Sequence, residues 1–281
     1  MNYKIITTTT TNFFLFWKLL SISVFVAFIS CKTSIARKSQ STMVHPCEPF
    51  DAFEQVQAME DGKLTAYKSK VPIVIDGCIA DEVWSQSDWY DMNYIWMGDP
   101  VALEDYQGRF KVAWDEDFLY LIVAVNDDFL NPTLKDGLEN YWKGDYVEVF
   151  IDEDGSGGDH KFNHQAFAYH VSTEGHAIDK NTQEETVFFD DHINVQRSQN
   201  GSMYVWEMAI KLYGKNFDEN SNANIPVSIK AEKRIGFSVA YGDNDGRLTR
   251  ENFMGSKKTH GANNDEGYIN ADVFGSLLFK E

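Results

Sequence analysis

Residues 141–152 have the sequence YWKGDYVEVFID, in which an aromatic loop leads directly into a strand of alternating side chains. Because successive side chains of a strand point to opposite faces, Val147, Val149 and Ile151 share one face. The opposite face carries a carboxylate, Glu148, between two aromatic side chains. The first face is typical of a protein core, so this segment predicts one strand of a packed sheet.

The aromatic loop and the neighbouring carboxylate form a combination that suits a sugar. A flat ring such as that of Trp142 can cover the apolar C–H face of a pyranose, and Glu148 can accept hydrogen bonds from the sugar hydroxyls. The same pattern also fits a half-buried strand with a solvated glutamate and a core tryptophan. Taken alone, the segment leaves both interpretations open.

Strand-like runs separated by polar turns continue on both sides of this segment. They span residues 72–76, 109–114, 118–125, 145–152, 165–172, 193–197, 203–210, 235–241 and 276–279. Turn signals at 115–117 and 199–201 predict two hairpins, and a short helix is expected over residues 81–87. Short strands without alternating long helices predict an all-β protein: an antiparallel β-sandwich with a short helix and long acidic loops.

The composition of the 281-residue chain agrees with this fold class and narrows the choice of partners. A hydrophobic fraction of 43% is enough for a sizeable core, and many aromatic residues with few prolines favour a β-rich protein. The net charge of −18 opposes binding to nucleic acid and docking on anionic lipid. This charge favours a neutral ligand and an exported domain. No pattern indicates an organic cofactor.

The N-terminal segment 1–30 is typical of an export signal. It contains no acidic residue, and its apolar run, residues 19–29, is short for a membrane span. The run ends at Ser30-Cys31 and resembles a bacterial lipobox, although Phe28 stands where leucine is usual. A soluble export signal with a chance cysteine is the alternative.

We therefore expect a lipoprotein whose mature chain begins at a lipidated Cys31. Residues 31–49 would form a tether and residues 50–281 one binding domain. The expected location is the cell envelope, with a lipid anchor at the outer membrane as the only membrane contact. The other cysteines, Cys47 and Cys78, are an even pair in an oxidising compartment, and either a disulfide or two free thiols would fit.

The acidic loop of residues 152–159 is a candidate for a structural calcium ion. Its oxygen donors are spaced two apart around glycines, as in Asp152 and Asp154, and hard oxygen ligands suit Ca²⁺. The loop lacks the register of an EF-hand. A flexible, solvated acidic loop is the alternative.

Five segments occur in an order that is informative as a set. They span residues 75–84, 112–128, 142–152, 204–210 and 274–278. This order resembles the family 9 carbohydrate-binding modules, which include sugar-binding lipoproteins of Bacteroidetes-type bacteria. The resemblance covers roughly residues 65–281. It implies a β-sandwich of the CBM9/DOMON-like kind that binds sugars without catalysis, often with structural calcium.

The resemblance also implies a sugar site. Family members hold a sugar between two aromatic side chains, and Trp142 stands where the first is expected. The second position falls on Tyr268, seven residues before Gly275. Glu148 matches a carboxylate that bonds sugar hydroxyls. A basic residue is usual on the strand 167–172, where His170 is the match, so a permanent charge is missing there.

The remaining tryptophans and two competing functions complete the expectations. Trp84, Trp114 and Trp206 should fill the core, whereas Trp96 could lie at the rim of the site. The leading expectation is binding of an oligo- or polysaccharide, accessory to polysaccharide catabolism. A glycoside hydrolase acting on O-glycosyl bonds would need two designated carboxylates, and no motif marks them. A haem-binding sandwich would need axial ligands, with His170 and Met208 as the candidates.

Overall fold

The computed structural model describes Cys47, Phe53 and residues 62–258 and 265–281, all within one compact unit, Ser41–Glu281. This part of the chain is almost entirely strands. The elements are β1 (Lys63–Lys68), α1 (Glu82–Gln86), β2 (Tyr90–Asp91), β3 (Tyr94–Met97), β4 (Tyr106–Trp114), β5 (Leu119–Asp127), η1 (Leu138–Asn140), β6 (Tyr146–Asp152), β7 (Phe167–Ser172), β8 (Ala177–Lys180), β9 (Thr186–Phe188), β10 (Ile193–Asn200), β11 (Met203–Ile210), β12 (Arg234–Asp243), β13 (Asn252–Gly255), η2 (Ala271–Val273) and β14 (Gly275–Lys280).

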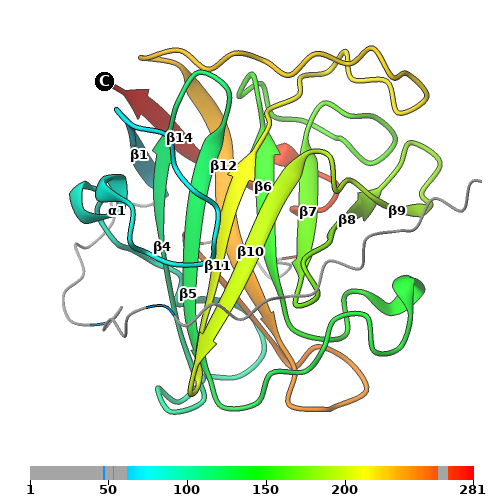
Figure 1. Ribbon diagram of the computed structural model, residues 1–281. Helices are drawn as coiled ribbons and strands as arrows, with labels where there is room; N and C mark the ends of the chain where they lie inside the picture. Colours follow the sequence, from blue (N-terminus) through cyan, green and yellow to red (C-terminus); the bar gives the residue numbers. More distant parts are fainter. Residues whose placement is uncertain (1–46, 48–52, 54–61, 259–264) are drawn as a thin grey trace, which may run out of the picture. The chain divides into compact units, whose positions relative to one another are not determined.

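The strands form one continuous ladder that folds back on itself into a sandwich. Its order is β10-β11-β5-β4-β1-β14-β12-β6-β7-β8-β9, and β1 and β14 pair in parallel at the fold line. Figure 1 shows β10, β11, β5 and β4 in one layer and β12, β6 and β7 in the layer behind. All other pairings except that of β1 with β4 are antiparallel, so the predicted antiparallel sandwich is confirmed.

The core between the layers is built from the alternating faces that the sequence predicted. Val147, Val149 and Ile151 of β6 are buried in the central cluster together with Trp114 and Trp206 from the opposite layer. Two further apolar clusters cover the outer faces of the sandwich. One packs α1 with its Trp84 against β4, β5 and β11, and the other lies over β6 and β12 around Phe150.

Most predicted elements are present, and the exceptions have a physical cause. Both hairpins and the short helix are confirmed. The prediction of a strand at residues 72–76 is wrong, because this segment has no ladder partner. Its end is held by a side chain instead: Glu207 Oε2 accepts from the backbone N–H groups of Asp76 and Gly77 at 2.9 and 3.0 Å.

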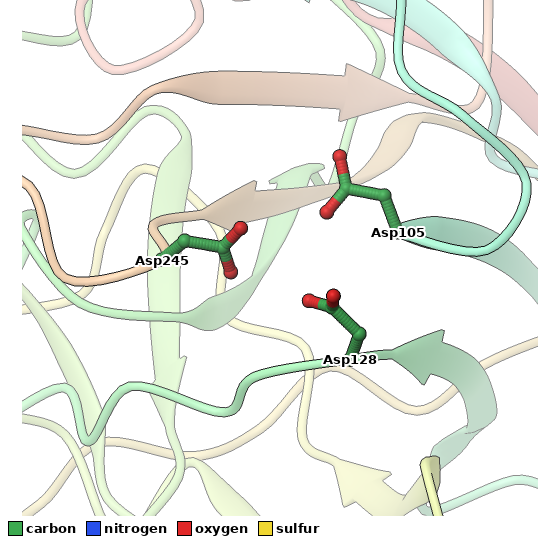
Figure 2. A group of neighbouring side chains, drawn as sticks. All are labelled: Asp105, Asp128 and Asp245. Carbon is green, nitrogen blue, oxygen red and sulfur yellow. The ribbon is translucent and has the colours of Figure 1, made fainter.

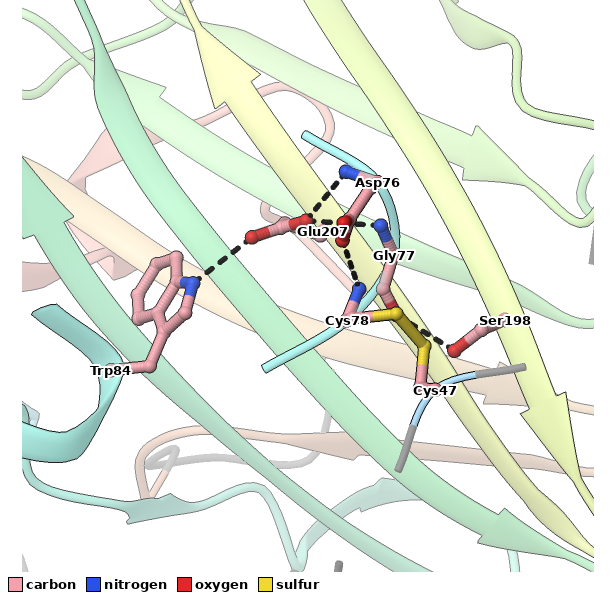
Figure 3. Close-up of a disulfide and its surroundings, with 7 residues drawn as sticks. All are labelled: Cys47, Asp76, Gly77, Cys78, Trp84, Ser198 and Glu207. Atoms are coloured by element: carbon pink, nitrogen blue, oxygen red, sulfur yellow. Dashed lines mark hydrogen bonds between the residues drawn. A yellow bond between two sulfur atoms is a disulfide. The ribbon is translucent and has the colours of Figure 1, made fainter. Parts of the chain in front are cut away.

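A disulfide joins Cys47 to Cys78 beside this contact (Figure 3), which resolves the question that the sequence left open. Glu207 also accepts from the indole Nε1 of Trp84 at 2.9 Å, and Ser198 donates to the carbonyl of Gly77 at 2.7 Å. Gly77 has φ +83°, and a Cβ there would lie 3.0 Å from the backbone of Arg197. The segment is therefore fixed against the outer face of β10 and β11.

The expected signal segment, the lipidated Cys31 and nearly all of the tether fall outside the described residues. Within the described part of the chain, no helix is long and apolar enough to cross a membrane.

Candidate functional site

A cavity of about 340 Å³ opens on the outer face of β6, β7 and β8. The structure brings all four of the predicted sugar-site residues to its lining: Trp142, Glu148, His170 and Tyr268. The chain positions of these residues span more than a hundred residues, so the fold assembles the site from separate segments. The other lining residues are Tyr141, Asp179, Lys180, Glu184, Arg250 and Asp265.

The two predicted aromatic residues expose much of their rings. Trp142 is 38% exposed and Tyr268 is 50% exposed, although both line the cavity. Trp96, in contrast, is buried: its ring packs on those of Phe150 and Phe253 beneath the site, and its Nε1 donates to the carbonyl of Lys257. The expectation that Trp96 could rim the site is therefore wrong.

The cavity is lined by two buried polar side chains from neighbouring strands. Glu148 on β6 and His170 on β7 are paired across the two strands, and both side chains are almost fully buried. His170 Nε2 lies 3.4 Å from Glu148 Oε2, but without hydrogen-bond geometry. Burial lowers the pKa of His170 to about 3, so the imidazole is neutral near pH 7 and its contact with Glu148 is not an ion pair.

The carboxyl group of Glu148 has a strongly raised pKa. Burial is the main cause, Asp265 adds repulsion, and Arg250 acts in the opposite direction. Burial also raises the pKa of Asp179 on β8 to about 7, although its carboxylate accepts from the backbone N–H groups of Ala168 and Lys180. A ligand that forms hydrogen bonds with these buried carboxyl groups in place of water lowers the free-energy cost of burying them.

A permanent positive charge does reach the cavity, but from a different element than expected. Arg250 lies in the loop between β12 and β13, and its guanidinium Cζ lies 4.0 Å from the centre of the Phe253 ring. Its Nη2 donates to Asp265 Oδ2 at 2.9 Å and its Nη1 donates to the hydroxyl of Tyr146. No local pattern marks Arg250, whereas Asp265 could have been suspected from its place three residues before Tyr268.

Asp145, directly before β6, ties together the two loops that carry Trp142 and Arg250. Its Oδ1 accepts from the backbone N–H of Asn244 at 2.8 Å, and its Oδ2 accepts from that of Asn131. Gly144 lets the first loop pass close to its neighbour, since a Cβ there would lie 2.7 Å from the carbonyl oxygen of Pro132. The loop that carries Trp142 is thus held by the hydrogen bond to Asp145 and by its close approach to the backbone of Pro132.

The carboxylates of Asp127, Asp145 and Asp243 form a buried group with their oxygens within 4.8 Å. Tyr241 donates to Asp127 Oδ2 at 2.6 Å. Burial, and after it the negative charge of Asp127, raise the pKa of Asp145 to about 9 and that of Asp243 to about 8.

A second carboxylate group lies nearer the surface, at the same end of β4, β5 and β12. Figure 2 shows Asp105, Asp128 and Asp245 converging, and their oxygens lie within 4.8 Å of one another. Burial raises the pKa of Asp105, and the charge of Asp128 raises it further. Burial and the negative charges of Asp128 and Asp105 raise the pKa of Asp245 to about 6.

The loop that the sequence suggested for calcium has a different geometry. Asp152 accepts from the backbone N–H groups of Gly155 and Gly157 at 3.1 and 2.7 Å, and Asp154 accepts from that of Ser156 at 3.0 Å. These carboxylates thus close their own loop. Among the described residues, the two groups of converging carboxylates lie elsewhere.

The two residues suggested as haem ligands are not brought together. Met208 is fully buried in the cluster between the layers. His170 lies on the opposite face of β7 from the residues that enter this cluster, Tyr169 and Val171.

Residues 75–281 match the family described as "Carbohydrate family 9 binding domain-like". The endo-1,4-beta-xylanases A of Thermotoga maritima and Thermotoga neapolitana are 39% and 40% identical over 80 and 81 residues, or 28% of this chain. The matched part is about 7% of the length of these xylanases.

Solved structures share the fold. A family 9 carbohydrate-binding module of Caldicellulosiruptor kristjanssonii in complex with cellotriose superposes with a TM-score of 0.56 at 18% identity, over 78% of this chain and 93% of that one. Its complex with glucose gives 0.55 at 19% identity over 77% and 95%. A putative carbohydrate-binding protein of Bacteroides uniformis gives 0.54 at 11% identity over 79% and 100%.

Proposed function

The chain belongs to the carbohydrate family 9 binding domain-like family, and from this premise we propose that its outer cavity binds one sugar unit of an oligo- or polysaccharide. The observation that carries the proposal is the joint lining of one cavity by two exposed aromatic rings and a buried carboxylate. The rings of Trp142 and Tyr268 would cover the apolar faces of a pyranose. Glu148 would accept hydrogen bonds from its hydroxyls.

The site would bind by preformed shape and a small apolar contact. A cavity of about 340 Å³ has room for one sugar ring with its hydroxyls, and the loop that carries Trp142 is held by the carboxylate of Asp145, which accepts from the backbone N–H of Asn131. One or two stacked rings bury little area, so we expect modest affinity for a single sugar unit.

A calorimetric screen tests this function on the protein with Trp142→Ala as the decisive variant. Glucose, cellotriose and xylo-oligosaccharides are the first ligands. Trp142→Ala should lose measurable binding and keep its melting temperature within a few degrees, because the ring is 38% exposed. Tyr67→Ala is the control, since Tyr67 is a similarly exposed ring, 40%, on β1 outside the cavity lining.

Two results would count against the proposed function. If the Trp142 variant binds every tested glycan as the parent does, the cavity is not the sugar site. If it unfolds while Tyr67→Ala does not, the ring belongs to the core.

We propose, in addition, a structural calcium ion, and the surface group of Asp105, Asp128 and Asp245 supports it better than the loop of Asp152 and Asp154. Three carboxylates from three loops converge there, and the pKa values of Asp105 and Asp245 are raised first by burial and then by repulsion from neighbouring carboxylates, which a bound cation would neutralise. Oxygen donors of this kind suit Ca²⁺. The ion would order the loops rather than take part in chemistry.

We also propose that the chain is a lipoprotein of the outer membrane. The apolar run that ends at Ser30-Cys31 and the polar stretch after it support this. A single acyl chain anchors only marginally, so the mature N-terminus should carry the full lipid modification. Mass spectrometry of the protein isolated from membranes should find Cys31 as a lipidated first residue. An unmodified N-terminus beyond Cys31 would contradict the anchor.

A further inference from the structure

The guanidinium of Arg250 is fixed in the wall of the cavity. Its side chain is only 8% exposed, stacks on the ring of Phe253 and donates from both terminal nitrogens, to Asp265 and to Tyr146. Asp265 lies on the segment of Tyr268, and Tyr146 lies two residues before Glu148 on β6. A planar group held on three sides keeps its orientation when a ligand enters.

Two buried polar atoms, on side chains that line this cavity, have no hydrogen-bond partner among the described residues. One is Nε of Arg250, which can only donate a hydrogen bond, and the other is Oε2 of Glu148. Both side chains line the same cavity, and each influences the pKa of the other by charge. Buried groups of this kind each cost about 1–3 kcal/mol when they stay unpaired, so their presence at one site points to a ligand that pairs them.

A sugar supplies the complementary pair. Each of its hydroxyls has one donor and two acceptor lone pairs, so one hydroxyl can accept from the guanidinium while it or its neighbour donates to the carboxyl oxygen. We propose that Arg250 is a ligand-contacting residue of the proposed sugar site, and that Arg250 and Glu148 together select sugars with free adjacent hydroxyls. This inference rests on the proposed function and goes beyond it by naming the groups of the ligand that are recognised.

The arrangement also assigns roles to the neighbours. Asp265 and Tyr146 are positioning residues because they bind the terminal nitrogens of Arg250 and leave Nε as the group without a protein partner. His170 stays neutral and fills the floor beside Glu148. Arg250, in the loop between β12 and β13, thus provides the permanent positive charge that His170 lacks.

Calorimetry with cellotriose on four variants tests the proposal. Arg250→Met, which removes the donors and the charge, should weaken binding at least tenfold. Arg250→Lys, which keeps the charge but not the Nε donor, should recover only part of this loss. Glu148→Gln, which keeps one oxygen, should weaken binding severalfold. Arg247→Met is the matched control, since Arg247 belongs to the same loop, is 72% exposed and lies outside the cavity lining, and it should bind as the parent does.

Monodeoxy sugars distinguish a direct contact from a structural effect. At least one monodeoxyglucose should bind the parent protein more weakly than glucose does. The same monodeoxyglucose and glucose should bind the Arg250→Met variant with equal affinity. A merely structural role of Arg250 would weaken all of these ligands by the same factor. Circular dichroism of each variant checks the fold, and Arg250→Lys keeps the test open if Arg250→Met does not fold.

The two levels of the argument fail separately. If Trp142→Ala abolishes binding while Arg250→Met and Arg250→Lys bind cellotriose like the parent, the sugar site stands and the role of Arg250 is wrong. Equal losses for glucose and every monodeoxyglucose in Arg250→Met would also overturn it. If Trp142→Ala has no effect on any ligand, the proposed function itself fails.

Discussion

The identity of single side chains around the cavity affects how the protein would bind a sugar, and the backbone fold alone does not determine it. Tyr268 stands where the family resemblance implies an aromatic plate, and its ring is half exposed at the rim of the cavity. A phenol ring offers a smaller flat face than an indole. The position therefore limits how much of a sugar ring the protein can cover.

Tyr268→Trp should preserve or tighten sugar binding. The larger ring buries more apolar area against the ligand, and a gain of about 0.5–1 kcal/mol corresponds to a severalfold lower dissociation constant. Calorimetry with glucose and cellotriose measures it. Loss of binding in a folded variant would show that the hydroxyl or the size of Tyr268 matters more than its flat face.

Glu207 is a buried carboxylate with a structural task. Burial raises its pKa to about 7, although three N–H groups donate to it and favour the ionised form. Because the folded-state pKa lies above the ordinary value of 4.5, the folded chain binds more protons than the unfolded one between these values. Its contribution to stability is therefore full below about pH 4.5 and is lost as the pH rises through about 7.

Glu207→Gln should flatten part of the pH dependence of stability. The parent should lose up to about 3 kcal/mol of unfolding free energy through this group between pH 5 and pH 8, and the glutamine variant should not. The variant should be about 1–3 kcal/mol less stable at pH 5, because an amide nitrogen replaces one acceptor oxygen. Urea unfolding at both pH values measures this, with exposed Glu139→Gln as the control. Equal pH slopes for parent and variant would contradict it.

At the scale of the elements, alternation in the sequence predicts most of the longer strands. Strand β6 was predicted with both its faces, because Val147, Val149 and Ile151 alternate with Tyr146, Glu148 and Phe150. Residues 72–76 have the same apolar character, but their contacts are with the side chain of Glu207 and an outer cluster, which alternation cannot distinguish from a ladder. The sequence analysis missed β1, β2, β3, β8, β9 and β13, which have six residues or fewer, because a short segment shows little periodicity.

The candidate site was predictable in part for the same reason. Trp142 and Glu148 belong to one strand and its loop, and Tyr268 precedes another strand at a fixed spacing. Arg250 lies in an irregular loop, and only the folded chain brings it beside Glu148. The convergence of Asp105, Asp128 and Asp245 likewise depends on which strand ends meet, which a single sequence does not show.

The segment that ends at Cys78 is clamped by a disulfide as well as by Glu207. Cys47 and Cys78 are 31 residues apart, and closing a loop of this size stabilises the folded state by about 3.7 kcal/mol in the chain-entropy account. The double variant Cys47→Ser with Cys78→Ser should unfold at lower denaturant and bind sugar as the parent does, because the clamp lies on the outer face of β10 and β11 whereas the cavity lies on that of β6 and β7. Unchanged stability, or a changed affinity in the folded variant, would contradict this separation.

At the scale of the whole molecule, the calcium proposal predicts that stability depends on divalent cations. A ligand that binds only the folded chain raises stability with its concentration, by about 2.7 kcal/mol at a hundredfold excess over its dissociation constant. Excess chelator should therefore lower the melting temperature, and added calcium should restore it. Asp128→Asn should weaken this response, whereas Asp154→Asn should leave it intact. A melting curve that chelator does not change would exclude a structural ion.

The pairing of β1 with β14 has a consequence for how the chain reaches its native state. Lys63 pairs with Ser276, and these two strands are the only link in the hydrogen-bonded ladder between the β4 half and the β12 half of the described sheet. The strand that completes the ladder, β14, is the last of the described strands in chain order. Contacts between such distant parts of a chain form slowly, because a long loop must close first. Before β14 pairs, both half-sheets have an exposed edge, so this stage of folding is when the chain is most prone to aggregate.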